Sequence, residues 1–249
     1  MSVESHRDPE ALLRQIEAAE RAERRGPLKI FLGYASGVGK SFKLFDEGRR
    51  RHERGEDVVI AAMQPDPSPP ELTHVIRTLP IIPTRNEGGV PVVDVAAVLA
   101  RHPQVCLVDG LAYDNPPGSR HPKRYQDVEE LLDAGISVLT SINLAYIAEE
   151  QEFVRHVLGR TKAETVPQAF IDQADEVVVV DAPPEGDTGI EEQQLSQLRQ
   201  RALLLTADVV DRQLEAYLHL NGIQSTWGTQ ERVLVCMTPR ANAARMLAS

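Results

Sequence analysis

The sequence of 249 residues predicts a three-layer α/β fold with a mostly parallel sheet, extended by helices at both ends. Three observations lead to this prediction. A glycine-rich loop follows a short apolar run near the N-terminus, and further apolar runs alternate with amphipathic helical patterns along most of the chain. Several of the runs end in acidic or polar residues, as buried parallel strands do when a site lies at their carboxyl ends.

The loop LKIFLGYASGVGKS, residues 28–41, indicates a phosphate site of the P-loop type. Its glycines let backbone N–H groups approach phosphate oxygens, Lys40 can reach the β- and γ-phosphates, and the Ser41 hydroxyl can bind Mg²⁺. A helix that starts at about Gly39 would direct its positive end at the same anion. The predicted cofactors are therefore ATP and Mg²⁺. The predicted cofactor-binding residues are Gly33, Ser36, Gly37, Val38, Gly39, Lys40, Ser41 and Phe42.

The loop departs from the usual pattern G-x-x-x-x-G-K-[ST] at one position. That pattern requires glycine at position 34, where this chain has Tyr34 preceded by Gly33. The alternative is a surface turn that carries a lysine by chance. An apolar strand at residues 30–32 and a helical apolar stripe that begins at Phe42 favour the phosphate loop.

The composition argues against a nucleic-acid-binding protein, a membrane-spanning chain, and a disulfide or cysteine metal site. The net charge of −10 and the pI of about 5.2 argue against a nucleic-acid partner. No run approaches 18 apolar residues and the N-terminus is polar, so we expect a cytoplasmic chain with no membrane span. Cys106 and Cys236 lie in apolar runs, which predicts free buried thiols rather than a disulfide or a metal site.

Before the second half of the chain, the predicted elements follow in this order. An N-terminal helical arm occupies residues 1–25, and the helix after the loop ends near Gly55. A second strand covers 57–62, prolines between 65 and 70 exclude regular structure, a hairpin lies within 80–93, and a helix covers 94–102.

The run Val105–Asp109 has the form of a Walker-B strand, whose final aspartate holds the Mg²⁺ shell. Asp109 and Ser41 are therefore the predicted metal ligands. The alternative for Asp109 is an ordinary helix cap at the end of a strand. The loop at residues 115–124 carries Arg120 and Lys123, either of which could sense the γ-phosphate or a partner, although a solvated loop explains the composition equally well.

The second half predicts a helix at 125–134 and a strand at 136–140. Ser141 and Asn143 follow this strand, where they either face a ligand or cap a helix that starts at about Leu144. A helix after Pro167, a strand at 176–181, two helices at 191–205 and 207–220, and a short strand at 232–237 complete the prediction.

On these residues, the chain resembles the N-terminal cytoplasmic domain of KdpD-type sensor kinases, the potassium and osmotic-stress sensors of bacterial two-component systems. The most specific match is the run from Gly118 to Leu132, and coverage extends from about Asp8 to Tyr217. Further matching segments are residues 28–33, 37–41, 107–109, 164–167, 174–176, 180–184 and 206–211. The resemblance divides the chain into the arm (1–25), a KdpD-type P-loop domain (26–221) and a tail (222–249) similar to the start of a universal-stress-like domain.

The resemblance implies an ATP-binding regulatory domain that acts with another signalling protein of the potassium response, with a homo-oligomer as an option. Transmembrane helices, a phosphoacceptor-histidine helix and a second ATP-binding domain are not found in the sequence. The chain is therefore not expected to carry out the histidine-kinase reaction by itself. One alternative is a P-loop ATPase or a serine/threonine-type phosphotransferase, in which Lys40, Asp109 and Arg120 are the catalytic residues. The other is a nucleotide-independent interaction scaffold in which Tyr34 partly fills the phosphate cradle.

The chain also departs from the family pattern, which has an acid where this chain has Gly110 and a histidine where it has Tyr113. The segment between Pro184 and Thr206 is also shorter. Without the acid we expect slow ATP hydrolysis, with Asp114 as a candidate substitute, and faster turnover in Gly110→Glu provided that position 110 does not need a positive φ. We expect the tail after Asn221 to be mobile or packed as an edge strand.

Overall fold

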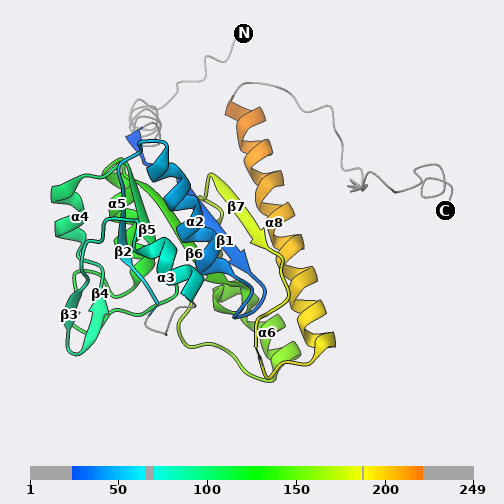
Figure 1. The fold of residues 1–249 in the computed structure, drawn as a ribbon. Coiled ribbons are helices and arrows are strands. Elements are labelled where there is room, and N and C mark those ends of the chain that lie inside the picture. The colour runs from blue at the N-terminus through cyan, green and yellow to red at the C-terminus, as the bar shows by residue number, and fades with distance from the viewer. Residues whose placement is uncertain (1–23, 65–69, 187, 221–249) are drawn as a thin grey trace, which may run out of the picture. The chain divides into compact units, whose positions relative to one another are not determined.

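A computed structural model describes residues 24–64, 70–186 and 188–220 (Figure 1). The predicted arm lies outside the described residues except for Arg24 and Arg25, and the predicted tail at 222–249, with its strand and Cys236, lies wholly outside them. The chain forms two compact units, Met1–Val210 and Asp211–Ser249. The first unit contains the sheet and the loop.

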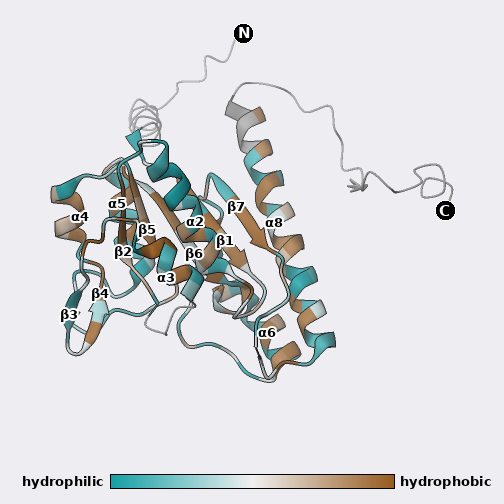
Figure 2. Ribbon diagram, viewed as in Figure 1, coloured by the Kyte–Doolittle hydropathy of each residue, from teal (hydrophilic) through white to brown (hydrophobic). Residues whose placement is uncertain are grey.

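A five-stranded parallel sheet with the strand order β2-β5-β6-β1-β7 confirms the predicted fold class. The strands are β1 (Leu28–Gly33), β2 (Val58–Ala62), β5 (Val105–Val108), β6 (Ser137–Asn143) and β7 (Glu176–Val180). Every residue of β2 and β5 is buried, and Figure 2 shows these strands as almost entirely hydrophobic. Such strands are covered on both faces, which explains why they are apolar throughout and do not alternate.

The connections between the strands produce three layers. The helices are α2 (Lys40–Glu53), α3 (Pro70–Ile76), α4 (Val95–Arg101), α5 (Arg124–Asp133), α6 (Gln151–Leu158), α7 (Gln168–Ile171) and α8 (Glu192–Leu220). From β1 the chain passes over the positions of β6 and β5 to form β2 at the edge of the sheet. It then forms β5 and β6 in order, back toward β1. Because such crossovers are right-handed, α2 covers one face of the sheet while α4 and α5 cover the other. Figure 1 shows α2 in front of the strands.

The predicted hairpin within 80–93 is present as β3 (Arg85–Glu87) paired antiparallel with β4 (Val90–Val92). Cys106 is buried and free, as predicted, and burial raises the pKa of its thiol to about 12. Within the described residues, no helix is both long and apolar enough to cross a membrane.

Three predictions about secondary structure were wrong. The prolines near position 70 do not exclude a helix, because Pro70 is the first residue of α3, where a missing N–H costs nothing. The helix predicted to start at Leu144 is instead two 3-10 turns, η1 (Leu144–Tyr146) and η2 (Ala148–Glu150), followed by α6. The two C-terminal helices are one helix, α8, which runs through the predicted break, where the Thr206 hydroxyl donates to the Ala202 carbonyl (3.0 Å).

Strand register determines what meets at the edge of the sheet where the loop lies. β6 lies between β1 and β5, with Thr140 opposite Val108 and Asn143 opposite Gly33. The carboxyl ends of β1, β5 and β6 therefore share one edge, where ligands bind in open parallel sheets.

Candidate functional site

The glycine-rich loop leaves β1 at Gly33 and enters α2 at Gly39, the N-cap residue. Among the described residues, no side chain caps this helix, and its first turn contains no acidic residue. The first N–H groups of an uncapped helix are unpaired donors, and the helix dipole adds positive potential there. The start of α2 therefore favours an anion.

Gly33 is required at the end of β1 because the Lys40 side chain folds back over it. A Cβ atom at position 33 would lie 2.6 Å from the Lys40 Cδ and 2.9 Å from a Val38 methyl group. A larger residue would therefore require the Lys40 or Val38 side chain to shift. The usual motif has its first glycine at position 34, whereas in this chain the glycine is Gly33. Gly33 leaves space for the Lys40 side chain.

Lys40 is a buried cation, and few polar groups offset the cost of removing its charge from water. Its side chain is only 7% exposed, and its ammonium group donates to the Ala35 carbonyl at 3.1 Å. Burial lowers the Lys40 pKa to about 8, against a smaller opposing effect of the Asp109 charge. An ammonium group has three donors, and this is the one hydrogen bond that it makes within the described residues.

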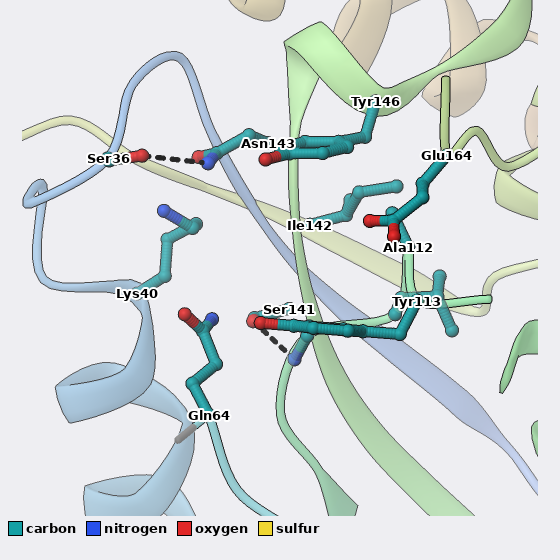
Figure 3. A pocket seen from close by; sticks show the side chains of 12 residues that line it. Ser36, Lys40, Gln64, Ala112, Tyr113, Ser141, Ile142, Asn143, Tyr146 and Glu164 are labelled. Carbon is teal, nitrogen blue, oxygen red and sulfur yellow. Dashed lines mark hydrogen bonds between the residues drawn. The ribbon is translucent and has the colours of Figure 1, made fainter. Parts of the chain in front are cut away.

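Two cavities meet at Lys40, Ser36, Gln64 and Asn143, which line both of them. The larger cavity has a volume of about 400 Å³. Its other lining residues are Gly37, Gly39, Ser41, Phe42, Glu71, Leu72 and Glu185. The smaller cavity, shown in Figure 3, has a volume of about 130 Å³. Its other lining residues are Gly110, Leu111, Ala112, Tyr113, Ser141, Ile142, Tyr146 and Glu164.

The loop residues predicted from the sequence divide between these cavities and the interior. Ser36, Gly37, Gly39, Lys40, Ser41 and Phe42 line the larger cavity. Val38 is buried, and the Lys40 side chain packs against the backbone of Gly33. Tyr34 lines neither of these two cavities, since its buried ring directs the hydroxyl to the Ala182 carbonyl at 2.7 Å. Its ring therefore does not fill the phosphate cradle, contrary to the sequence-based suggestion.

Asp109 is buried, lines neither of the two cavities and is held in place by its neighbours. Its backbone N–H donates to the Ala62 carbonyl at 3.0 Å, and its Oδ1 accepts from the Ser141 hydroxyl. Within the described residues, Oδ2 accepts no hydrogen bond. The structure brings Ser41 and Asp109 to the same edge of the sheet, but the described residues contain no ready-made cluster of three metal-binding side chains.

Ser141 and Asn143 face the site and do not cap a helix. Ser141 lines the smaller cavity, and its hydroxyl also accepts from the Gly110 N–H at 3.2 Å. The Asn143 side chain donates weakly to the Ser36 hydroxyl at 3.5 Å, and its carbonyl oxygen is buried without a partner among the described residues (Figure 3). Of the two alternatives from the sequence, the geometry therefore favours a ligand-facing role.

Gly110 does not tolerate the substitution that the sequence suggested. Its φ is +76°, and a Cβ atom there would lie 2.6 Å from the Tyr113 ring. Faster turnover in Gly110→Glu was expected only if position 110 did not need a positive φ. The observed backbone shows that it does. Gly110→Glu is therefore not expected to raise ATP turnover.

The structure does not bring Arg120 to the cavities. Its side chain is 52% exposed, and its guanidinium forms a two-point ion pair with Glu130 of α5. Lys123 is paired with Asp114 at 2.6 Å, so Asp114 does not replace the missing acid either. The alternative of a solvated loop, tied down by its own ion pairs, describes this segment.

Arg124, four residues further on, occupies the buried position instead. Its guanidinium donates to the carbonyls of Asp109 (3.1 Å) and Gly110 (2.9 Å) and lies over the Tyr113 ring at 4.3 Å from its centre. Burial lowers its pKa, and nearby negative groups oppose this effect. Arg124 is a positioning residue for the strand end that carries Asp109.

Comparison with known proteins decides the family. A family model described as the osmosensitive K⁺ channel His kinase sensor domain, KdpD, matches residues 24–188. The chain belongs to this KdpD sensor-domain family. The match ends shortly before α8, so the whole of that helix lies beyond the residues that the family model covers.

The curated relatives of this KdpD-family chain are longer proteins. It is 35% identical to the sensor protein KdpD of Escherichia coli K12 over 96% of this chain and 29% of the relative. Identity to the sensor protein KdpD of Mycobacterium tuberculosis H37Rv is 38%, over 86% of this chain and 28% of the relative. A KdpD-named sensor protein of Synechocystis sp. PCC 6803 is 34% identical over 92% of this chain and 67% of the relative. The chain thus spans less than a third of the first two relatives.

Sequence reasoning missed two site residues of this KdpD domain. Arg124 was passed over for Arg120, because both lie in one basic segment and only burial separates them. Glu164 was noted as part of a family motif, but its place on the wall of the smaller cavity depends on a loop far from β1 in sequence. The family motif at 164–167 was the available signal for that residue.

Proposed function

We propose that the chain binds MgATP at the loop from Gly33 to Ser41 and acts as a regulatory module in potassium or osmotic two-component signalling. The observation that carries the proposal is Lys40, a buried ammonium group at the mouth of two cavities with a single hydrogen bond to a loop carbonyl. A buried cation without an ion-pair partner is costly unless an anion completes it. Phosphate oxygens would supply that anion.

The remaining residues fit a nucleotide and its metal. The larger cavity, at about 400 Å³, lies within the range of cofactor pockets, and Phe42 and Leu72 give it an apolar wall suited to a base. A hydroxyl from Ser41 and a carboxylate from Asp109 are the oxygen ligands that Mg²⁺ prefers, with phosphate oxygens and water completing its shell. Arg120 has no part in this proposed site, because its charge is already paired with Glu130.

The signalling role is proposed from the family. The relatives are named as sensor proteins, and the family description refers to the sensor domain of an osmosensitive histidine kinase. We propose that nucleotide binding biases a conformation read by another signalling protein of the potassium response in the cytoplasm, either as a monomer or as a homo-oligomer. The histidine-kinase reaction itself is not assigned to the described residues.

Calorimetric titration of the full chain with MgATP tests the binding proposal. Lys40→Ala should weaken binding at least about tenfold, since a charge-assisted hydrogen bond to phosphate contributes roughly 1.5–3 kcal/mol. Lys43→Ala is the matched control, because Lys43 is an exposed lysine one turn further along α2 and should be neutral. Equal affinities for all three proteins would place the nucleotide elsewhere, and absence of binding to the wild type would favour the interaction scaffold.

The second candidate function is an ATPase or a serine/threonine-type phosphotransferase. The observation that favours it is the smaller cavity, which Lys40 also lines, which Phe42 does not line, and which includes a carboxylate, Glu164. Release or transfer of the γ-phosphate, measured with and without an added acceptor protein, separates the two classes.

A further inference from the structure

The smaller cavity is too small for a nucleotide. Its volume of about 130 Å³ lies below the usual range for cofactor pockets, roughly 300–1,000 Å³. It is large enough for about four water molecules at roughly 30 Å³ each. Because Lys40 lines both cavities, a phosphate bound at Lys40 would have the nucleotide on one side and this small polar chamber on the other.

Among the described residues, Glu164 is the one carboxylate on the wall of this chamber. Figure 3 shows its side chain entering beside Ala112, with Tyr113 and Tyr146 on either side. No hydrogen bond or ion pair joins its carboxylate to another described residue, although it lies near enough for its charge to act on Tyr113 and on the Arg124 guanidinium. Three other acids have partners: Asp109 accepts from Ser141, Asp114 pairs with Lys123, and Glu150 pairs with Arg201. Glu71 and Glu185 line the larger cavity and not this chamber.

The backbone around Glu164 is fixed, although the residue lies in a loop. Two residues later, the Val166 N–H donates to the Tyr146 carbonyl at 2.8 Å, and the Val166 carbonyl accepts from Ala148 at 2.9 Å. Val166 is buried, and α7 begins shortly after it at Gln168. The carboxylate is thus carried by a segment attached to the same 3-10 turns that present Tyr146.

We propose that Glu164 is the catalytic carboxylate for an attacking water molecule held in the smaller cavity, in the role that Gly110 cannot fill. This inference rests on the proposed MgATP site. The water oxygen forms a bond to the γ-phosphorus, and the bond from that phosphorus to the β,γ-bridging oxygen breaks. The electron pair of that bond leaves with ADP, the water proton passes to Glu164, and the other product is inorganic phosphate.

The test uses the full chain and three variants. Glu164→Gln keeps the shape of the side chain and removes its basicity, and Glu164→Asp keeps the carboxylate and withdraws it by one methylene. Glu152→Gln is the matched control, because Glu152 is an exposed acid on α6 that lines neither described cavity. Thermal unfolding establishes that each variant is folded, and the Asp variant carries the test if the Gln variant is not.

Three quantities are measured: MgATP affinity, phosphate release in a single turnover, and affinity for MgADP with vanadate, which places an oxygen at the attacking position. Glu164→Gln should keep MgATP affinity within about threefold and lose 10²–10⁴-fold in phosphate release. It should also lose the preference of the wild type for MgADP–vanadate over MgADP. Phosphate release and the preference for MgADP–vanadate should be intermediate in Glu164→Asp. Both should equal the wild-type values in Glu152→Gln.

Two results would overturn the inference while leaving the proposed function intact. One is a wild type that binds MgATP but releases no phosphate, and the other is a Glu164→Gln variant with wild-type release and vanadate affinity. A wild type that binds no MgATP overturns the proposed function itself, and the first titration identifies that case before any turnover is measured.

Discussion

At the scale of single residues, the site is defined by positions where only one side chain fits. Gly33 leaves room for the Lys40 stem, and Gly110 combines a positive φ with a Tyr113 ring 2.6 Å from where a Cβ atom would lie. Tyr113 is itself held beneath the Arg124 guanidinium. The carboxylate that many P-loop enzymes carry next to the Walker-B aspartate therefore has no room beside the Tyr113 ring of this chain.

Gly110→Ala should lower the free energy of unfolding by about 2–4 kcal/mol, as the sum of left-handed backbone strain and overpacking against Tyr113. Gly118→Ala separates the two effects, because Gly118 also has a positive φ (+92°) but no described atom lies within 4 Å of its Cβ position. That control should lose only about 1–2 kcal/mol. Urea denaturation measures both values. Equal losses would show that the contact with Tyr113 does not matter.

At the scale of secondary-structure elements, α8 is attached to the sheet domain by an apolar stripe and by ion pairs. Leu198, Ala202, Leu205 and Val209 are buried, at the spacing of one helix face. Arg201 makes a two-point contact with Glu150 of η2 at 2.6 and 2.7 Å, and only 2% of the Glu150 side chain is exposed. Arg199 pairs with Asp181 in a much more exposed position.

Arg201→Ala should destabilise the protein by about 3 kcal/mol, because it leaves the buried Glu150 carboxylate without its counter-charge. Arg199→Ala removes the same kind of side chain two residues earlier and should cost at most about 1 kcal/mol, as exposed ion pairs do. Chemical denaturation of the two variants in parallel provides the comparison. If both cost the same, the Arg201 pair does not anchor α8.

At the scale of the whole molecule, the described core is contained in the first compact unit. The buried residues that pack together run from Leu28 in β1 to Val209 in α8, and both cavities lie at the carboxyl edge of the one five-stranded sheet. The core that supports the proposed site therefore requires no residue after Val209 among those described.

Deletion of residues 222–249 should leave the melting temperature of the protein nearly unchanged. A segment this short cannot bury a core of its own, and the described core ends before it. Differential scanning calorimetry of the full and shortened chains measures the effect. A loss of several degrees would mean that the tail packs against the domain and contributes to its stability.

Local sequence patterns determined the order of elements and the loop. Continuous apolar runs predicted the parallel strands, because a strand covered on both faces needs no polar side, and the glycine-lysine-serine sequence predicted a phosphate loop before α2. The errors arose where local signals are weak. Pro70 suits a helix start as well as a break, and a single threonine inside α8 does not end a helix whose buried stripe continues past it.

The tertiary structure alone decided which charged residues belong to the site. Arg120 and Arg124 are equivalent in a sequence, but one is paired at the surface with Glu130 and the other is buried against the backbone of Asp109 and Gly110. Glu164 lies more than fifty residues after Gly110, and the two line the same cavity because the segment of Glu164 is hydrogen-bonded at Val166 to the turns that follow β6. Burial and long-range contact depend on the packing of distant segments, and no local pattern encodes either.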